Sequence, residues 1–154
     1  MIAAIKAHSL GLAKRILILD MDQHYGNGTD DIIKKLAIDY VDHITAGKPY
    51  ETASQALQCA DLSANNGIRD KRYDLVLYQA GADIHIDDPL GGLLTTEQMM
   101  MRDELVFRGC ATHGIPVVWN LAGGYQRDAD GGISRVLALH RNTICQCIKA
   151  AVAV

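Results

Sequence analysis

Short apolar segments, separated by segments of helical periodicity, set the pattern of this chain. The clearest run, residues 16–19, contains four branched apolar residues and leads directly into Asp20, Asp22 and His24. Such an unbroken run is typical of a strand that is buried on both faces. Strands are also predicted at residues 74–79 and 116–121, which contain similar runs, and at the more polar residues 39–44, so that the first strand covers residues 16–22.

Helices are predicted between these strands, from apolar residues at helical spacing and from signals at helix ends. Thr29 is expected to cap the second helix, which carries aspartates in its first turn and lysines in its last. Thr95 and Gln98 form a capping-box pattern at the start of a later helix that ends near Gly114. The predicted helices cover residues 2–13, 29–36, 51–68 and 95–114 and a last segment after Gly131-Gly132. Their expected buried faces include Ile2, Ile5 and Leu12; Ile32, Ile33 and Leu36; and, on the last helix, Ile133, Val136, Leu137, His140, Ile144, Ile148 and Ala151.

The alternation of helices and strands predicts an α/β fold in which helices cover a parallel sheet. Parallel strands need crossover connections, which are right-handed and usually helical. A chain of 154 residues is long enough to bury a substantial core, so we expect residues 1–154 to form a single domain.

Composition narrows the class of protein. The net charge of −3 argues against a general nucleic-acid-binding surface, and no apolar stretch is long enough to cross a membrane. Lys6 and His8 interrupt the apolar N-terminal stretch, which makes it a poor signal peptide. The four cysteines include no C-x-x-C pair, so a zinc knuckle is not expected and the thiols should be free in a reducing cytoplasm.

Polar residues with metal-binding chemistry follow three of the predicted strands. Asp22 and His24 lie at the end of the first strand, and the period-two alternation of a strand turns them to the same side. Asp83 follows the third strand, and Gly123-Gly124-Tyr125 follows the fourth. Because the carboxyl ends of parallel strands lie along one edge of the sheet, these residues are expected to form one site.

The residue types in this group suit metal-assisted catalysis. Two carboxylates and one imidazole can bind a divalent ion and leave positions open for water and substrate. A bound ion polarises a carbonyl, and the Tyr125 hydroxyl could donate to the oxyanion that forms. Gly123 and Gly124 would let the backbone approach the substrate closely. Two other interpretations remain open: a buried strand followed by a polar loop that caps the next helix, and a Rossmann-like domain of unrelated function that binds no metal.

Three stretches, in this order along the chain, resemble motifs of the histone deacetylase superfamily: DMDQHYGNGT, LVLYQAGADIHIDDPLGGLLT and LAGGYQ. The resemblance is closest to the bacterial deacetylase-like amidohydrolases. It implies an arginase/deacetylase fold, a three-layer α/β/α arrangement around a parallel sheet, whose N-terminal part is missing from this chain. It also implies a zinc-dependent amidohydrolase that acts on an acyl-amide of the acetyl-lysine or acetylpolyamine type.

The same resemblance implies roles for individual residues. Asp22, His24 and Asp83 match the residues that bind zinc, with iron(II) as the alternative ion. Tyr125 matches the tyrosine that polarises the substrate carbonyl. Asp20 matches a residue that helps to hold a structural potassium ion next to the zinc.

The chain departs from the family in the residues for proton transfer. Family members carry two adjacent histidines in a G-x-x-H-H-A stretch, which act as general base and acid, and no two histidines are adjacent in this sequence. His85 lies where family members often carry a histidine, and it is not assigned as the base. We therefore predict a slow or inactive enzyme, and the alternative is a non-catalytic relative that binds a metal or a partner protein.

The family's strand order leaves the strand at residues 116–121 at an edge of the sheet, next to the missing part. An exposed edge strand is prone to pair with another chain. A homodimer or a partner chain is therefore expected to cover Pro116–Leu121, and neither a nucleic acid nor a membrane is expected as a partner.

Overall fold

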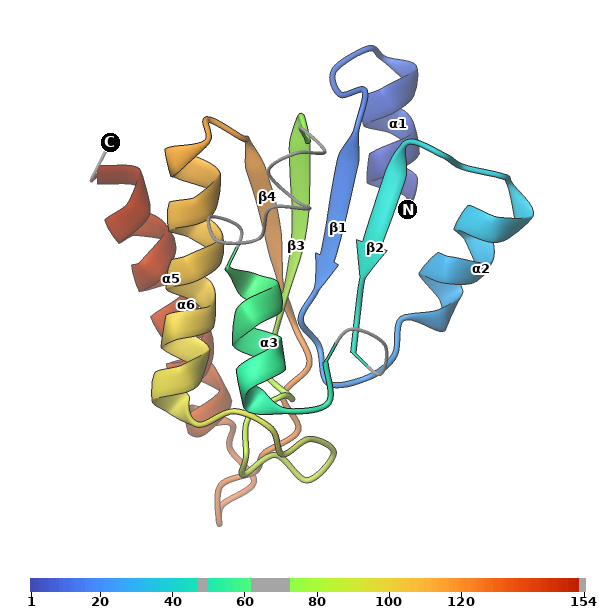
Figure 1. Ribbon diagram of the computed structural model, residues 1–154. Coiled ribbons are helices and arrows are strands. Elements are labelled where there is room, and N and C mark those ends of the chain that lie inside the picture. The colour runs from blue at the N-terminus through green and yellow to red at the C-terminus, as the bar shows by residue number, and fades with distance from the viewer. Residues whose placement is uncertain (47–49, 62–72, 153–154) are drawn as a thin grey trace.

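The structure is a computed structural model that describes residues 1–46, 50–61 and 73–152. Helices and strands alternate along these residues, as the apolar pattern predicts (Figure 1). In chain order the elements are α1 (Ile2–Ser9), β1 (Ile16–Asp20), α2 (Asn27–Lys35), β2 (Val41–Ile44), α3 (Ala53–Ala60), β3 (Leu75–Gly81), α5 (Thr96–Thr112), β4 (Val117–Ala122) and α6 (Ser134–Val152).

The four strands form one parallel sheet in the order β2-β1-β3-β4. All four predicted strands are present, and the parallel α/β fold is confirmed. Strand β1 ends at Asp20 rather than at residue 22, and β3 continues to Gly81. The register places Asp20 opposite Gln79, and Gly81 opposite Ala122. The carboxyl ends of β1, β3 and β4 therefore lie together at one edge of the sheet.

The two faces of the sheet pack against different helices, because successive side chains along each strand alternate between them. Leu17, Leu19 and Tyr78 belong to the larger core, which includes residues of α3, α5 and α6. Ile16 and Ile18 belong to a smaller core, which includes residues of α1 and α2. Figure 1 shows α3, α5 and α6 on one side of the sheet and α1 on the other, a three-layer arrangement.

The buried face of α6 differs from the face that its apolar residues predict. Leu137 is 58% exposed, and of the predicted stripe only Val136 is buried in this helix. The buried residues of α6 are Val136, Leu139, Thr143, Gln146 and Ala150. The Thr143 hydroxyl donates a hydrogen bond to the buried carboxylate of Asp103 in α5, at 2.6 Å. A polar contact between α5 and α6 therefore helps to determine which face of α6 is buried. A prediction from hydrophobicity alone selects the wrong face.

The first two helices also differ from their predictions. Helix α1 ends at Ser9 rather than at residue 13, and its buried residue is Ala4, while Ile2 is 88% exposed. Ala4 packs in the smaller core with Ile16 and Val41 of the sheet. Helix α2 begins at Asn27 with Gly26 as its N-cap, so the prediction of Thr29 as the cap is wrong. It buries no residue fully, and only Ile33 of its predicted face packs against the smaller core.

The third predicted helix, residues 51–68, is observed as α3 over Ala53–Ala60. Its predicted part from residue 62 onward lies outside the described residues. Thr52 caps α3 with a capping box that also uses Gln55. The predicted capping box of Thr95 and Gln98 is confirmed at the start of α5.

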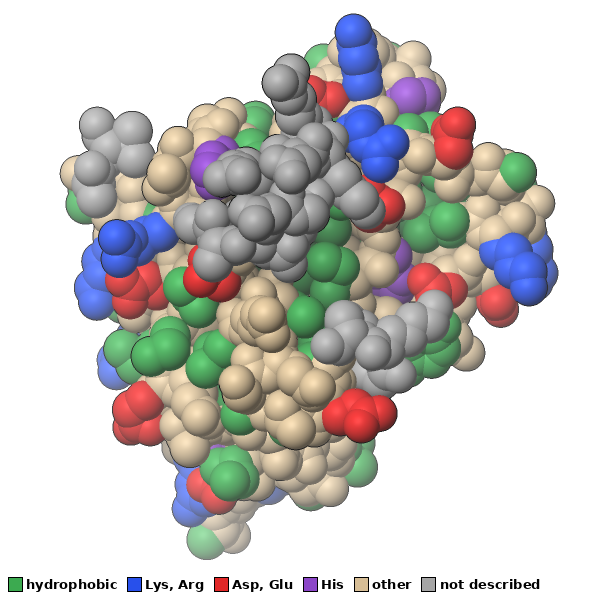
Figure 2. Space-filling model, viewed as in Figure 1, with side chains coloured by type: hydrophobic (Ala, Val, Ile, Leu, Met, Phe, Trp, Pro, Cys, Tyr) green, Lys and Arg blue, Asp and Glu red, His purple; other side chains and the backbone are tan. Residues whose placement is uncertain are grey.

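Strand β4 lies at an edge of the sheet and pairs with β3 alone. Val118 on this strand is 61% exposed. Cover of this edge by a second copy or by a partner chain stays a prediction. Figure 2 shows acidic and basic side chains interspersed on the visible surface rather than gathered by sign. Among the described helices, none combines the length and the hydropathy that a membrane crossing requires.

Thr95→Ala should lower the free energy of unfolding by about 1 kcal/mol, because it removes the hydroxyl that accepts the Gln98 N–H and so breaks the capping box of α5. Thr29→Ala is the matched control, since Thr29 lies inside α2 and alanine has the higher helix propensity there. Its expected change is close to zero or slightly stabilising. Urea denaturation measures both, and equal losses would contradict the two cap assignments.

Candidate metal centre

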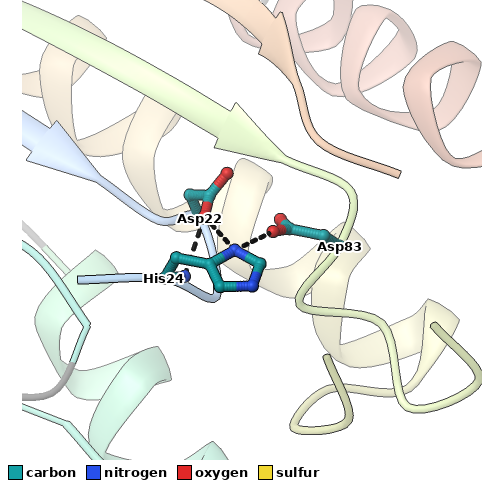
Figure 3. Close-up of side chains that lie close together, drawn as sticks. All are labelled: Asp22, His24 and Asp83. Carbon is teal, nitrogen blue, oxygen red and sulfur yellow. Dashed lines mark hydrogen bonds and ion pairs between the residues drawn. The ribbon is translucent and has the colours of Figure 1, made fainter. Parts of the chain in front are cut away.

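Three side chains with metal-binding chemistry converge at the carboxyl ends of β1 and β3. Asp22 and His24 follow β1, and Asp83 lies two residues beyond the end of β3. One ligand atom from each of the three lies within 4.8 Å of the others. Figure 3 shows the three side chains pointing toward one another across the gap between the two strand ends. The structure thus brings together the Asp-His pair and the aspartate that the sequence predicts as one site.

The distances within this group are those of hydrogen-bonded ion pairs. Nδ1 of His24 lies 3.1 Å from Oδ1 of Asp22 and 2.8 Å from Oδ2 of Asp83. Asp83 is fully buried, whereas the His24 side chain is 53% exposed. The site is therefore closed on the side of β3 and open to solvent on the side of His24.

The charges of the group shift the pKa values of two of its members. Burial, followed by the negative charge of Asp22, raises the pKa of Asp83 to about 6. Burial lowers the pKa of His24, but hydrogen bonds and charge attraction from Asp22 and Asp83 raise it by more, so the net shift is upward. Two carboxylates held this close repel each other, and a cation between them would relieve that repulsion.

The donors present fit a divalent transition metal. Oδ2 of Asp83 is buried and accepts no well-aligned hydrogen bond from the described residues, although it forms the ion pair with His24. A buried carboxylate oxygen without a hydrogen bond is costly unless a cation or a donor satisfies it. One imidazole and two carboxylates supply three of the four positions of a zinc site and leave at least one open, as catalytic sites do. Iron(II) accepts the same donors.

Glycines allow the backbone to pack directly against the carboxylates. A Cβ at Gly81 would lie 2.5 Å from Cα of Asp22, so the ends of β1 and β3 approach as closely as this glycine permits. Gly123 has a φ of +59°, and a Cβ there would lie 2.5 Å from Oδ1 of Asp83. Gly124 has a φ of +97° and packs against Val136 of α6. Gly123 and Gly124, which are predicted to let the backbone approach the substrate, are thus also required by the packing of the protein itself.

Tyr125 follows β4 and lies on the same edge of the sheet. Its backbone N–H donates a 2.7 Å hydrogen bond to Oδ2 of Asp88, which is buried in the loop after Asp83. The Tyr125 side chain is partly exposed, and its hydroxyl makes no hydrogen bond with any described residue. The backbone of Tyr125 is therefore held in place while its hydroxyl remains available.

Asp20, the predicted potassium-site residue, belongs to a neighbouring buried cluster. Oδ1 of Asp20 accepts the N–H of Asp22, and Oδ2 lies 3.9 Å from Nε2 of His43. Nδ1 of His43 lies 2.7 Å from Oδ1 of Asp30 in α2. Burial lowers the pKa of His43, but hydrogen bonds to Asp20 and Asp30 and their charges raise it by more. The cluster links the end of β1 to β2 and α2.

His85 is occupied by structural contacts. Its Nε2 lies 3.0 Å from the Thr96 hydroxyl, and its Nδ1 lies 3.1 Å from the Asp87 N–H and from Nε2 of Gln126. The residue is buried. These contacts give His85 a structural role, and the general base stays without an assigned residue.

Sequence reasoning missed Arg102, Asp88 and Tyr50, which support the site from outside. Arg102 donates to the carbonyl oxygens of Met21 and Gly81, and the Tyr50 hydroxyl donates to the carbonyl oxygens of Asp20 and Asp22. Helical spacing offered one signal, because Met99, Arg102 and Val106 share a face of α5 that buries its apolar members. No local pattern marks Tyr50, and Asp88 lies within the second of the three motif stretches, which by itself assigns it no role.

Comparison with known proteins agrees with this architecture. Residues 48–140 match the histone deacetylase domain. The chain is 32% identical over 151 residues to an uncharacterized protein of Picosynechococcus sp., covering 85% of this chain and 49% of that protein. It is 31% identical over 147 residues to histone deacetylase 2 of Arabidopsis thaliana, covering 80% and 36%. The chain thus spans half or less of the length of these relatives.

Two solved structures share the fold. Acetylpolyamine aminohydrolase from Burkholderia pseudomallei superposes with a TM-score of 0.70 at 21% identity, over 94% of this chain and 48% of that one. The HD domain of HDA15 superposes with a TM-score of 0.60 at 20% identity, over 97% and 55%. At these identities the likeness establishes the fold, and the predicted arginase/deacetylase arrangement is confirmed.

Gly81→Ala should destabilise the protein by about 1–3 kcal/mol, because the added Cβ would meet the backbone of Asp22 and force β1 and β3 apart. Gly28→Ala is the matched control. Apart from the local helix backbone, no atom of the described residues lies within 4 Å of its Cβ position, and alanine is favoured over glycine within α2 by up to about 1 kcal/mol. Urea denaturation of both variants checks the close approach, and a neutral Gly81→Ala would contradict it.

Proposed function

Because the chain belongs to the histone deacetylase family, we propose that it is a deacetylase-like amidohydrolase domain whose Asp22, His24 and Asp83 bind zinc, with iron(II) as the alternative. The observation that carries this proposal is the convergence of these three donors within 4.8 Å at two strand ends. The buried Oδ2 of Asp83 supports it, because its close partner among the described residues is Nδ1 of His24, itself a proposed ligand, and a cation between the three groups would satisfy this oxygen.

The proposed reaction is the hydrolysis of an acyl-amide. Bound zinc would supply Lewis-acid activation of the carbonyl and of a water molecule. The Tyr125 hydroxyl would donate a hydrogen bond to the carbonyl oxygen as negative charge develops there. A single donor of this kind is worth about 10²–10³ in rate. The hydrogen bond from the Tyr125 N–H to Asp88 would hold the tyrosine at the edge of the sheet, and Gly123 and Gly124 would form the adjoining wall of the substrate site.

The proposed substrates are acylated amines of the acetyl-lysine or acetylpolyamine type. The names of two relatives, a histone deacetylase and an acetylpolyamine aminohydrolase, support this class. A cavity of about 280 Å³, lined by Gln23, Tyr25, Tyr50 and Leu93 among others, adjoins the chain between the two ligands that follow β1.

Two further features of the proposal concern the surroundings of the metal. We propose that Asp20 helps to hold a potassium ion beside the zinc, as the resemblance implies, and its buried carboxylate supports this. Proton transfer has no assigned residue, since no two histidines are adjacent and His85 is held by structural contacts. The second candidate is a non-catalytic relative that binds a metal or a partner protein, which the lack of two adjacent histidines in these 154 residues favours.

Zinc should stabilise the wild-type chain in thermal denaturation, by about 2.7 kcal/mol at a free concentration 100 times the Kd. Asp83→Asn should abolish most of this effect, because it removes the buried anionic ligand. Asp87→Asn, an exposed aspartate four residues further on, is the matched control and should respond like the wild type. Metal analysis of the purified proteins gives the second readout. Equal zinc responses in all three proteins would contradict the assigned ligands.

The purified 154-residue chain should turn over acetyl-lysine peptides and acetylated polyamines slowly or not at all. General acid–base catalysis is typically worth about 10²–10⁴ in rate, and the chain has no assigned group for it. Any residual zinc-dependent activity should fall by about 10²–10³ in Tyr125→Phe. Turnover at the rate of a complete deacetylase would overturn the predicted impairment, and tight zinc binding without turnover would favour the non-catalytic candidate.

A further inference from the structure

We infer that Arg102 is a positioning residue for the metal centre, because its buried guanidinium holds the ends of β1 and β3 at the spacing that the ligands need. The inference rests on the proposed metal site. Arg102 lies in α5, and its side chain is fully buried. Nη1 donates hydrogen bonds to the carbonyl oxygens of Gly81, at 2.7 Å, and Met21, at 3.3 Å.

The two carbonyl groups lie at the point where the strands separate. The register of β1 and β3 ends at Asp20 opposite Gln79, and one further backbone hydrogen bond joins the Met21 N–H to the Gln79 carbonyl. Met21 precedes Asp22 by one residue, and Gly81 precedes Asp83 by two. Nη1 of Arg102 therefore bridges the two segments that leave β1 and β3, just before the proposed metal ligands Asp22 and Asp83. The described backbone hydrogen bonds between β1 and β3 have ended at this point.

The guanidinium is itself fixed in orientation. Its Nε donates to Oδ1 of Asp103 at 2.8 Å, and Nη2 lies 2.8 Å from the same oxygen. Asp103 also accepts hydrogen bonds from the hydroxyls of Tyr78 in β3 and Thr143 in α6. The Asp103 carboxylate balances the charge of Arg102, so a buried cation near the site need not oppose the binding of a metal ion.

Stability alone is a weak reason for this arrangement. A buried ion pair is often no more stabilising than apolar side chains of similar volume, because both charges lose their hydration. A planar guanidinium, however, can contact a carboxylate with one edge and two carbonyl oxygens with another nitrogen, which a lysine ammonium cannot do in the same geometry. The specific gain from Arg102 is therefore the position of the two strand ends. Loss of a group that hydrogen-bonds to a metal ligand typically changes metal affinity by about 10–100-fold, and Arg102, which binds the backbone next to two ligands, is expected to act at the lower end of that range.

The test compares Co²⁺ binding, followed by its visible absorption, in four versions of the 154-residue chain. The double variant Arg102→Met with Asp103→Asn removes the charge pair and leaves an amide for Tyr78 and Thr143. Arg102→Lys keeps the positive charge but loses the planar guanidinium with its several N–H donors. Arg108→Met is the matched control, since Arg108 lies on the same helix with an exposed side chain paired to Glu104. Urea denaturation establishes that each protein is folded.

We expect the folded double variant to bind Co²⁺ at least tenfold more weakly than the wild type and with an altered spectrum, and Arg102→Lys to lie between them. Arg108→Met should match the wild type in both readouts. A folded double variant with the wild-type Kd and spectrum would overturn the role of Arg102. If the double variant does not fold, a folded Arg102→Lys with wild-type values has the same meaning. A wild-type chain that binds no Co²⁺ would instead refute the proposed metal site, and the role of Arg102 with it.

Discussion

Parallel pairing of β1 with β3 is the constraint on which the candidate site depends. The register runs from Ile16 opposite Leu75 to Asp20 opposite Gln79, so the carboxyl ends of the two strands lie at the same edge of the sheet. Asp22 and Asp83 are 61 positions apart in the sequence, and only this pairing makes them neighbours. A slip of one residue would turn each side chain to the opposite face, so the two buried cores of the sheet also protect the geometry of the site.

The site stores unfavourable interactions that the rest of the fold must hold in place. Asp22 and Asp83 repel each other, and burial adds to the cost of keeping Asp83 charged. Gly81 and Gly123 let backbone approach these carboxylates more closely than any other residue would permit. Such an arrangement is poor for the stability of the metal-free protein and favourable for a cation, which is consistent with a site selected for binding rather than for packing.

A buried polar network connects this edge of the sheet to the helical layer. Arg102 and Asp103 from α5 join Tyr78 of β3, Thr143 of α6 and the carbonyl groups beyond the ends of β1 and β3. The same network accounts for the unexpected rotation of α6, because Thr143 must face Asp103. Packing of the helices and spacing of the strand ends are therefore coupled through one set of hydrogen bonds.

Local sequence patterns were sufficient to predict the four strands, the capping box of Thr95 and the grouping of Asp22 with His24. Each of these features depends on neighbours in the sequence or on the common direction of parallel strands. The proximity of Asp83 to Asp22 and His24 follows from the common direction of the two strands. The orientation of α6, the burial of Ala4 in place of Ile2 and the roles of Arg102 and Asp88 were decided only by tertiary structure. Each of these depends on which surfaces meet across the fold, and a polar or small side chain at such a contact leaves no periodic signal along the chain.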